Sequence, residues 1–416
     1  MSLAVTGATL DGLPIGLRAE EGAIAELGPA VEPRPGDEVI DASGQLLCPP
    51  MVNGHTHAAM TLLRGFGDDM PLLEWLETKI WPAEARLEPA DVYWGTRLAC
   101  LEMIRSGTTR FVDMYWYGAE VARAVVDAGL RAVVSSVIID QLDPAKGERM
   151  KPEVLETLDR LAEAGPRVEP SLGPHAIYTV SAATLRWIVE VAAERAIPVQ
   201  IHLSEAEQEV TDCLRAHGKR PAAYLDELGF LGPGTLLAHG VWLDEAELEM
   251  VAERGATVVS NPAANMKLAV GGELSYPQAV RAGVALGLGT DGPSSNSNLD
   301  MFEEVKILAL KQKHDSRDPA TLPASEALAI ARGLRSEVVG GTPLAIGEPA
   351  DFLLLRGSDP ELSAGDLDAD LVYAANGSVV DATVVGGEVL MRDRRIEGAE
   401  EIVAEVRLRA GRLTGL

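Results

Sequence analysis

Two histidines, His55 and His57, are the first residues along the chain whose types and spacing could do chemistry. They follow the apolar run 46–52, which reads as a buried strand. Residues two apart in a strand point to the same face, so both imidazoles leave this strand together. Two neutral imidazoles that converge on one point form half of a metal site. The alternative is a pair of unrelated histidines in a turn.

Further ionisable residues end later predicted strands and favour the metal site. His202 and His239 each end an apolar stretch, and Glu205 follows His202 by three residues. Asp291 ends the apolar, glycine-rich stretch 287–290. A carboxylate in such a place costs free energy unless it is paired or bound to a cation, so we expect Asp291 to serve metal binding or catalysis.

His175 ends the fourth predicted strand and is open to two interpretations. It is either a satisfied rim histidine or a residue that binds ligand. The same strand contains no lysine, the residue that commonly bridges two metals at this place in barrel hydrolases, so we expect a single metal ion. His217 and His314 lie in charged, helical surroundings, and we expect both on the surface.

The middle of the chain alternates between strand and helix patterns. Eight candidate strands alternate with helical stretches such as 91–106, 153–164 and 182–196; the strands are expected near 47–53, 108–114, 131–139, 167–173, 197–202, 235–239, 256–260 and 284–290. This order predicts an α/β fold, a (β/α)₈ TIM barrel over residues 47–343, with a doubly wound open sheet as the rival. Catalytic groups of such barrels gather at the carboxyl ends of the strands, where these ionisable residues fall.

The two ends of the chain have a different hydrophobic pattern from the middle. Short alternating stretches broken by glycine and proline occupy 1–46 and return in 344–416, so we expect one small discontinuous β-sandwich domain built from both ends. The long connection 61–89 is rich in leucine and tryptophan, and we interpret it as a functional lid; the alternative is that its aromatic side chains only pack against the barrel. The stretch 261–265 is interpreted as a turn.

Composition excludes several classes of function. The chain carries a net charge of -27, which disfavours nucleic acid and anionic membrane surfaces as partners. No apolar run is long enough to cross a bilayer. Cys48, Cys100 and Cys213 follow no zinc-finger or redox spacing, and no secretory signal precedes Gly7, so we expect a cytosolic protein with reduced thiols.

Three histidines and one carboxylate suit one divalent ion, zinc in the first place, with iron, nickel or manganese as alternatives. Such an ion lowers the pKa of a bound water toward about 7. Asp291 can then act as general base, Glu205 as acid toward the substrate, and His239 as a hydrogen-bonding partner of the attacking oxygen. These roles describe hydrolytic attack on an electrophilic carbon and leave the departing group open.

A family resemblance is carried by motifs that span nearly the whole chain. They are the run Asn53-Gly54-His55-Thr56-His57 through Gly65 with Trp81-Pro82-Ala83-Glu84, then 173–179, His202-Leu203-Ser204-Glu205, Ala238-His239-Gly240, 265–268, Asp291-Gly292 and 298–302. With them the sequence resembles the amidohydrolase superfamily, and within it the 5'-methylthioadenosine/S-adenosylhomocysteine deaminases. The resemblance implies deamination of an adenine nucleoside to an inosine-type product and ammonia, by a homodimer or larger assembly.

The resemblance also implies a role for individual positions of this sequence. The metal ligands would be His55, His57, His202 and Asp291. Glu205 would move a proton to the purine ring nitrogen, and His239 would assist the attacking hydroxide. The substrate would be contacted by His175 at the heterocycle, by Glu84 at the ribose hydroxyls and by Arg149 after strand three.

The sequence departs from the subgroup's pattern at three positions. Ile177 stands where proline is usual, Ser260 where a histidine commonly precedes Asn-Pro, and Ser297 interrupts an asparagine pair. Two alternative functions therefore stay open: an amidohydrolase that deaminates or dechlorinates another N-heterocycle (guanine, cytosine, pterin or triazine type), and a non-catalytic metal-binding scaffold. A purely structural site would not need a free acid such as Glu205, which argues against the scaffold.

Overall fold

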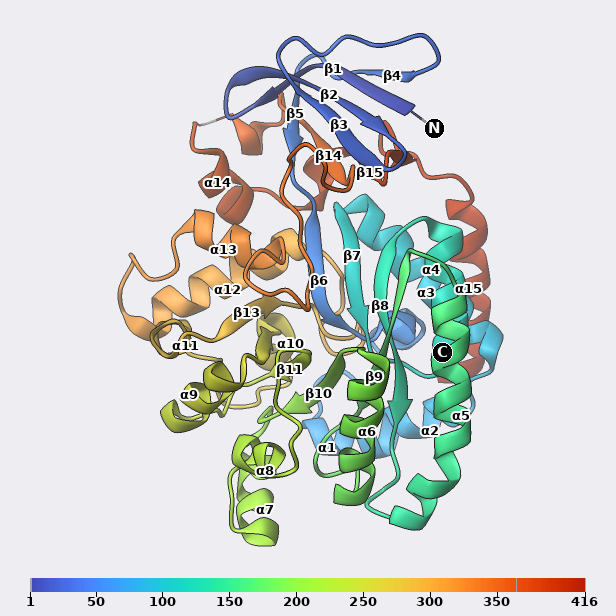
Figure 1. Cartoon of the computed structure of the whole chain (residues 1–416), viewed down its shortest axis with the longest axis vertical. Coiled ribbons are helices and arrows are strands. Elements are labelled where there is room, and N and C mark those ends of the chain that lie inside the picture. The colour runs from blue at the N-terminus through green and yellow to red at the C-terminus, as the bar shows by residue number, and fades with distance from the viewer. Residues whose placement is uncertain (1, 364, 416) are drawn as a thin grey trace.

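A computed structural model describes residues 2–363 and 365–415 of the chain, and Figure 1 shows two separate sheets. The central sheet has eight parallel strands that neighbour each other in chain order. They are β6 (Met51–Thr56), β7 (Thr108–Asp113), β8 (Arg131–Ile138), β9 (Val168–Pro174), β10 (Val199–Leu203), β11 (Thr235–His239), β12 (Thr257–Ser260) and β13 (Ala285–Leu288). The predicted barrel with a small β domain is therefore confirmed.

Side-chain bonds join the first and last strands of this sheet. The Asn53 amide donates to Thr290 Oγ1 at 2.7 Å and accepts from the Thr290 backbone N–H at 3.0 Å. One residue later, the Asp291 N–H donates to the His55 carbonyl oxygen at 3.0 Å. The bonds that close the barrel therefore also bring Asp291 next to His55.

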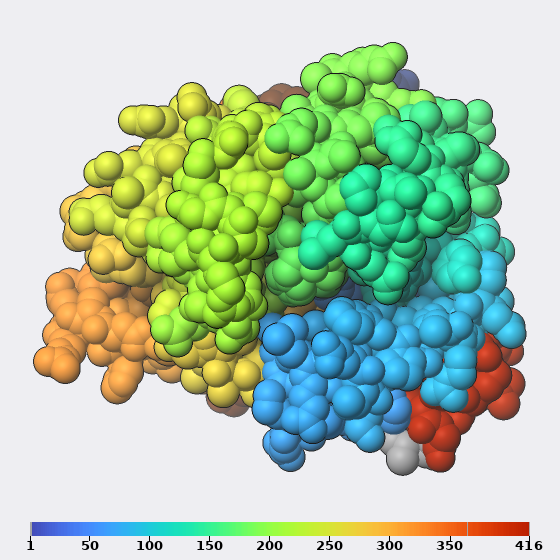
Figure 2. All heavy atoms as spheres, turned by 90° about the horizontal axis from the view of Figure 1, so that it is seen from below, coloured from blue at the N-terminus to red at the C-terminus, as the bar shows by residue number. Residues whose placement is uncertain are grey.

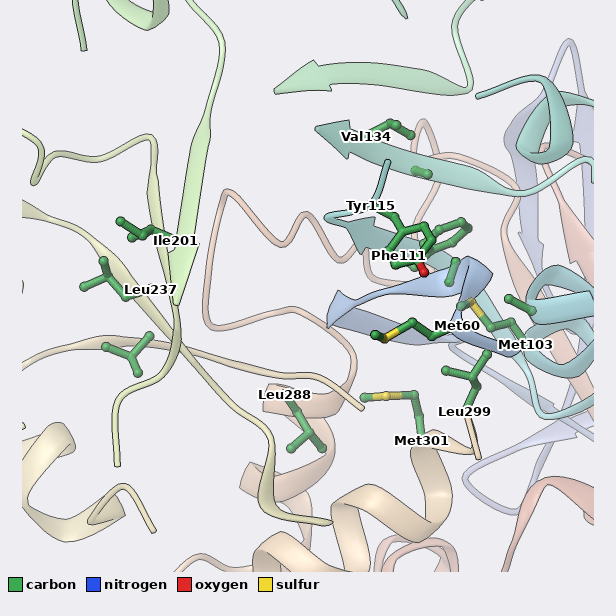
Figure 3. Close-up of a cluster of buried hydrophobic side chains, with 14 of the residues drawn as sticks. Met60, Met103, Phe111, Tyr115, Val134, Ile201, Leu237, Leu288, Leu299 and Met301 are labelled. Atoms are coloured by element: carbon green, nitrogen blue, oxygen red, sulfur yellow. The ribbon is translucent and has the colours of Figure 1, made fainter. Parts of the chain in front are cut away.

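Alternate residues of the strands face opposite sides, as a period of two requires. Inward-pointing residues fill the barrel centre with a small apolar cluster: Val52, Val112, Val133, Leu236 and Val259, together with Val339. The outward-facing strand residues Phe111, Val134, Ile201, Leu237 and Leu288 belong to the larger core shared with the helices, and Figure 3 labels them together with Met60 and Met301 of the same core.

Helices surround the sheet, and several have clear sequence reasons for their ends. α9 begins at a capping box of Asp244 and Glu247 and ends at Gly255, whose φ is 73°. The barrel helices are α3 (Pro89–Arg105), α4 (Gly118–Ala128), α5 (Pro144–Glu163), α6 (Ala182–Arg195), α7 (Glu207–His217), α8 (Pro221–Glu227), α9 (Glu245–Arg254), α10 (Pro262–Lys267), α11 (Tyr276–Ala282), α12 (Met301–Ser316) and α13 (Ala324–Ala331). Within the described residues, none of the helices combines the length and apolar character needed to span a membrane.

Two local predictions differ from the structure. The stretch 261–265 is not a plain turn, because Pro262 occupies the first turn of the short helix α10. The expected strand 47–53 is divided at Pro49-Pro50, which lack backbone donors. Its first part belongs to β5 (Gln45–Cys48) in the second sheet, and only its second part belongs to β6.

The second sheet combines both ends of the chain, with the order β16-β15-β14-β5-β1-β2-β3 and β4 beside β1. Its strands are β1 (Ser2–Leu10), β2 (Leu13–Glu20), β3 (Ala23–Gly28), β4 (Glu38–Asp41), β14 (Phe352–Arg356), β15 (Val380–Val385) and β16 (Glu388–Met391), with short turns η3 (Pro360–Leu362), α14 (Leu367–Ala369), η4 (Asp370–Ala374) and η5 (Gly377–Val379) between β14 and β15. It has its own core, which includes Leu17, Phe352 and Val384. The domain boundaries at 46/47 and 343/344 stay a prediction.

Two further segments complete the barrel. The connection after β6 folds into η1 (Ala58–Leu63), α1 (Leu72–Trp75), the π-helical turn η2 (Leu76–Ile80) and α2 (Trp81–Glu84). The last helix, α15 (Ala399–Thr414), lies against α3, and both Arg409 and Arg412 donate to the fully buried Asp91. Asp91 also accepts from the Glu88 N–H at 2.8 Å.

This arrangement predicts that Asp91→Ala destabilises the fold. The change removes a helix cap and two charge-assisted hydrogen bonds, and should lower the free energy of unfolding by about 2–3 kcal/mol. Urea unfolding followed by circular dichroism measures it. The control is Asp212→Ala, which removes an exposed pair with Arg215 and should cost under about 1 kcal/mol. Equal losses in the two variants would contradict the role of Asp91 in docking α15.

Candidate functional site

A cavity opens at the carboxyl ends of the barrel strands. Figure 2 views this end of the molecule and shows a hollow between the blue segment that follows β6 and the green segments of the middle of the chain. Apolar walls come mainly from the 61–89 connection, including Leu72, Trp75 and Trp81. The polar residues that line the cavity are His57, Glu84, His175, His202, Glu205, His239, Asp291 and Ser295, together with the tyrosine and tryptophan at 115 and 116.

Potential ligand atoms converge at the floor of this cavity. His55, His202, His239 and Asp291 are buried and each offers one atom to a cluster in which all four atoms lie within 4.8 Å of one another. His57 adjoins this cluster: its Nε2 lies 3.2 Å from His202 Nε2 and 3.2 Å from Asp291 Oδ1. The four predicted metal ligands are therefore together in space, with His239 as an additional member of the cluster.

Hydrogen bonds to Nδ1 define which ring nitrogens face the cluster. His57 Nδ1 lies 2.5 Å from the Met114 carbonyl oxygen, and His202 Nδ1 lies 2.7 Å from that of His175. A carbonyl oxygen only accepts, so both Nδ1 atoms carry the hydrogen. In a neutral ring Nε2 is then a bare lone pair.

His55 has the same tautomer for a less direct reason. The Gln200 Nε2 donates to the Asp113 carbonyl oxygen at 2.8 Å and to Ser135 Oγ at 2.6 Å, so the other amide atom, Oε1, faces His55. His55 Nδ1 donates to it at 3.3 Å, which leaves His55 Nε2 buried and without a hydrogen-bond partner among the described residues, 3.7 Å from Asp291 Oδ1.

These lone pairs need a cation. Ligand atoms about 2.1 Å from a tetrahedral zinc ion lie roughly 3.4 Å apart, close to the two 3.2 Å separations at His57. Burial lowers the pKa of His55 to about 3, so this ring is neutral. Burial also lowers the pKa of His57, but Asp291 outweighs it and raises that pKa to about 9, so positive charge is favoured at this point. The donor set fits one divalent ion.

Asp291 is held in a fixed orientation. Its Oδ2 accepts from Ser295 Oγ at 2.6 Å, which leaves Oδ1 for the histidines, and its backbone has a φ of 59°. Burial opposes the charge of Asp291, but the hydrogen bond and charge of His57 hold its pKa well below the usual range. The side chain is thus an ionised carboxylate that can bind a metal or take up a proton.

Glu205 faces the same cavity from the other side. Its Oε1 lies 3.8 Å from His239 Nε2. The preceding residue, Ser204, has a φ of 52°, and the buried carboxylate of Glu209 accepts from the N–H groups of both Ser204 and Glu205 at 3.0 Å. Burial raises the pKa of Glu205, which favours the protonated form that a general acid needs.

Two of the three predicted substrate contacts line the cavity. His175 Nδ1 lies 3.0 Å from Thr179 Oγ1, and its ring centroid lies 4.8 Å from that of His202. Glu84 accepts from Trp116 Nε1 at 3.2 Å on the far wall. Arg149 is not brought to the cavity: it lies on α5 with its side chain 68% exposed and 3.7 Å from Asp143. As expected, His217 and His314 are exposed.

The sequence did not predict the residues that hydrogen-bond to the site histidines and to the Glu205 segment. Gln200 could have been found, because it is polar in an apolar strand and shares the face of His202 two residues later. Asn265 accepts from His239 Nδ1 at 2.8 Å, and Glu209 supports Glu205, but neither position carries a local signal. Ile177 is buried in the core, and Ser297 binds Lys267 at 2.7 Å.

Comparison with known proteins supplies independent evidence. The model of the amidohydrolase family matches residues 46–390. A 5'-deoxyadenosine deaminase of Methanoregula boonei is 48% identical over 405 residues, which cover 95% of this chain and 91% of that protein. A 5-methylthioadenosine/S-adenosylhomocysteine deaminase of Archaeoglobus fulgidus is 42% identical over 406 residues, or 96% of this chain and 95% of its own.

A solved structure is similar along the full chain. It is an adenosine deaminase from Xanthomonas campestris with bound zinc, which superposes with a TM-score of 0.91 at 31% sequence identity. The match covers 100% of this chain and 98% of that one.

The tautomers predict which histidines hold a metal. His57→Ala and His202→Ala should each lower the affinity for zinc by at least about 10-fold, because each change removes one bare Nε2. The zinc content per chain after dialysis should fall accordingly. Elemental analysis measures the content. His217→Ala is the matched control, since that ring stacks on Tyr224 at the surface. Full metal retention in His57→Ala would refute His57 as a ligand.

Proposed function

The chain belongs to the amidohydrolase family, and from this premise we propose that it is a metal-dependent hydrolytic deaminase of adenine nucleosides. The observation that carries the proposal is the buried acid Glu205 in the same cavity as the ligand cluster and Asp291. Relatives at 40–48% identity named as deaminases of 5'-deoxyadenosine or methylthioadenosine and S-adenosylhomocysteine support the substrate class.

We infer that one divalent ion, zinc in the first place, is held by His55, His57, His202 and Asp291. The bare Nε2 lone pairs support this ligand set, and the zinc in the similar adenosine deaminase supports the element. When bound, the ion lowers the pKa of a water toward about 7 and so supplies hydroxide at neutral pH. His239 then remains at the edge of the ligand set, between the ion's site and Glu205.

The remaining residues divide the proton transfers between them. Asp291 takes the proton from the attacking water, whose oxygen adds to C6 of the adenine ring. Glu205 gives its proton to the adjacent ring nitrogen, because an aromatic carbon bearing nitrogen becomes electrophilic only when that nitrogen is protonated. The C6–N bond then breaks with its electron pair on nitrogen, and ammonia leaves with the proton from Asp291. The hydroxyl group at C6 gives up its proton, which returns to Glu205, as the C6=O bond of the inosine-type product forms. His239 bonds the attacking oxygen throughout.

Glu84 is proposed to hold the ribose. Its Oε2 accepts from Trp116 Nε1, and a carboxylate keeps further acceptor sites for a pair of hydroxyl groups. Trp81 and Trp116 line the same wall and offer apolar faces to the sugar and base. Arg149 as a substrate contact would require a movement of α5 or of its side chain toward this wall, and it stays a proposal on the resemblance alone.

The 5' position of the ribose is proposed to face a second cavity of about 880 Å³. This cavity shares Trp81, Glu84 and Trp116 with the site, so a group attached beyond the ribose could continue into it. Its lining carries both signs of charge, including Lys146 and Glu153, which suits a zwitterionic substituent. The assembly state, a homodimer or larger, also remains a prediction.

An activity panel tests the proposal. The zinc-loaded protein should release ammonia from 5'-methylthioadenosine, 5'-deoxyadenosine, S-adenosylhomocysteine and adenosine, with the ultraviolet change of adenine becoming hypoxanthine. Guanine, cytosine and a chlorinated triazine are assayed as substrates that represent the alternative functions. If one of these three compounds is turned over faster than every nucleoside, the substrate is another N-heterocycle. If no compound is turned over, the non-catalytic metal-binding scaffold is favoured.

Glu205→Gln tests the acid. The amide has the same shape but cannot give up a proton, so kcat should fall by about 10²- to 10⁴-fold while the metal content is unchanged. Glu207→Gln is the control, because that neighbouring carboxylate is exposed and outside the cavity. Activity retained in Glu205→Gln would exclude the proposed proton donor.

Glu84→Ala tests the ribose contact. Losing hydrogen bonds to a carboxylate, worth about 1.5–3 kcal/mol, should lower kcat/KM for adenosine by about 10- to 100-fold and leave any turnover of free adenine unaffected. Glu77→Ala, an exposed carboxylate of the same connection, should change neither. Unaltered nucleoside turnover in Glu84→Ala would remove this assignment.

A further inference from the structure

Ser260 and Asn265 flank the Asn-Pro pair after β12, and the proposed proton transfers use neither of them. The structure joins both to one carboxylate. Glu273 Oε1 accepts from Ser260 Oγ at 2.7 Å and from the Leu274 N–H at 3.1 Å, while Glu273 Oε2 accepts from Asn265 Nδ2 at 2.9 Å. Asn265 Oδ1 in turn lies 2.8 Å from His239 Nδ1.

The carboxylate determines which way the Asn265 amide points. Burial raises the pKa of Glu273, but the hydrogen bonds from Asn265, Ser260 and the Leu274 N–H favour its ionised form, which has no hydrogen to donate. The amide atom that faces the ionised carboxylate is then the NH₂ group. The oxygen of the amide is then the atom that faces His239. Asn265 is fully buried, and its rotation by 180° would place two acceptors face to face at Glu273.

The orientation of the amide fixes the tautomer of His239. Because an amide oxygen only accepts, His239 Nδ1 must carry a hydrogen. Nε2, which lies 3.8 Å from Glu205 Oε1, is then the atom presented to the cavity. The ring needs such support, since His239 has a φ of 73°, an unfavourable backbone conformation at a strand end.

We propose that Glu273 is a positioning residue for His239, acting through Asn265, and that Ser260 holds Glu273 in place. The chain Ser260–Glu273–Asn265–His239 keeps the Nε2 of His239 free to accept a hydrogen bond from the attacking water. That consequence for catalysis depends on the proposed function, whereas the tautomer itself does not. Ser260, where a histidine is usual in this subgroup, thereby has a role: its small hydroxyl group donates to a carboxylate that lies 13 residues later.

An exchange of acid and amide tests the arrangement. Asn265→Asp alone places two carboxylates against each other, and Glu273→Gln alone leaves one amide hydrogen facing another donor. Each should lower kcat by about 10- to 100-fold, the range found when the partner of a functional histidine is lost. In the double variant Asn265→Asp/Glu273→Gln every donor meets an acceptor again. The introduced amide donates through its nitrogen to the introduced carboxylate, and its oxygen still accepts from Ser260.

The expected result is recovery of kcat in the double variant to within about 10-fold of the unmodified protein, with unchanged metal content and melting temperature. A double variant no more active than the weaker single variant, although folded and metal-loaded, would overturn the proposal. Glu249→Gln, an exposed acid on the neighbouring helix α9, is the matched control and should behave as the unmodified protein.

A second readout does not depend on activity. Two-bond ¹H–¹⁵N correlation spectra of the zinc-loaded protein, labelled in histidine, distinguish the tautomers, and the His239 signals are assigned by their absence in His239→Gln. We expect hydrogen on Nδ1 in the unmodified protein and the double variant, and loss of this single tautomer in Asn265→Leu. Hydrogen on Nε2 in the unmodified protein, or an unchanged tautomer in Asn265→Leu, would overturn the proposal. The spectra test the tautomer of His239 even if no nucleoside is turned over. Failure of the proposed function can therefore be told apart from failure of the positioning role of Glu273.

Discussion

The site depends on one electrostatic constraint: several bare imidazole nitrogens and a carboxylate are held together in a buried space. His55, His57 and His202 each give their Nδ1 hydrogen to an oxygen of Gln200 or of the backbone, so their Nε2 lone pairs all point inward. Lone pairs at 3.2 Å repel one another unless a positive charge lies between them. A divalent cation removes this repulsion. Without one, the positive charge comes from a proton on His57, whose pKa Asp291 raises to about 9.

The barrel maintains this arrangement at a cost to its own backbone. Ser204, His239 and Asp291 all have positive φ values, and each such residue costs about 1–3 kcal/mol. Each is held by a nearby bond: Glu209 accepts from Ser204, Asn265 from His239, and the His55 carbonyl oxygen from Asp291. Strain of this kind concentrates where side chains must turn into a pocket, and here it occurs at the ends of β10, β11 and β13.

Much of the fold was predictable because its signals are local. Apolar runs of strand length separated by helical patterns located the eight strands within a few residues, and histidines at strand ends had to meet at one edge of a parallel barrel. The split of the first strand has a local signal in Pro49-Pro50, but the assignment of its first part to the second sheet has none, because it depends on the long-range pairing of Leu47 with Leu354. The helix at Pro262 was missed because Asn-Pro also begins turns.

The supporting residues of the site were less accessible to sequence reasoning. Strand alternation assigns His239 to the side of Leu237, outside the barrel, and only the backbone turn at its φ of 73° brings the ring inward. The pairing of Asn265 with Glu273 depends on a loop whose path has no sequence pattern. Arg149 was placed by resemblance, but α5 carries it to the surface because its helical neighbours Val154 and Leu158 turn the opposite face to the core.

The most direct test concerns the identity of the ligands. Anomalous diffraction at the zinc edge, recorded from crystals of the zinc-loaded protein, locates the ion relative to each ring. The account predicts one ion at about 2.0–2.2 Å from Asp291 and from the Nε2 atoms of His55, His57 and His202, with His239 Nε2 beyond bonding distance. An ion bound through His239 with His57 left free, or no ordered ion among these residues, would contradict it.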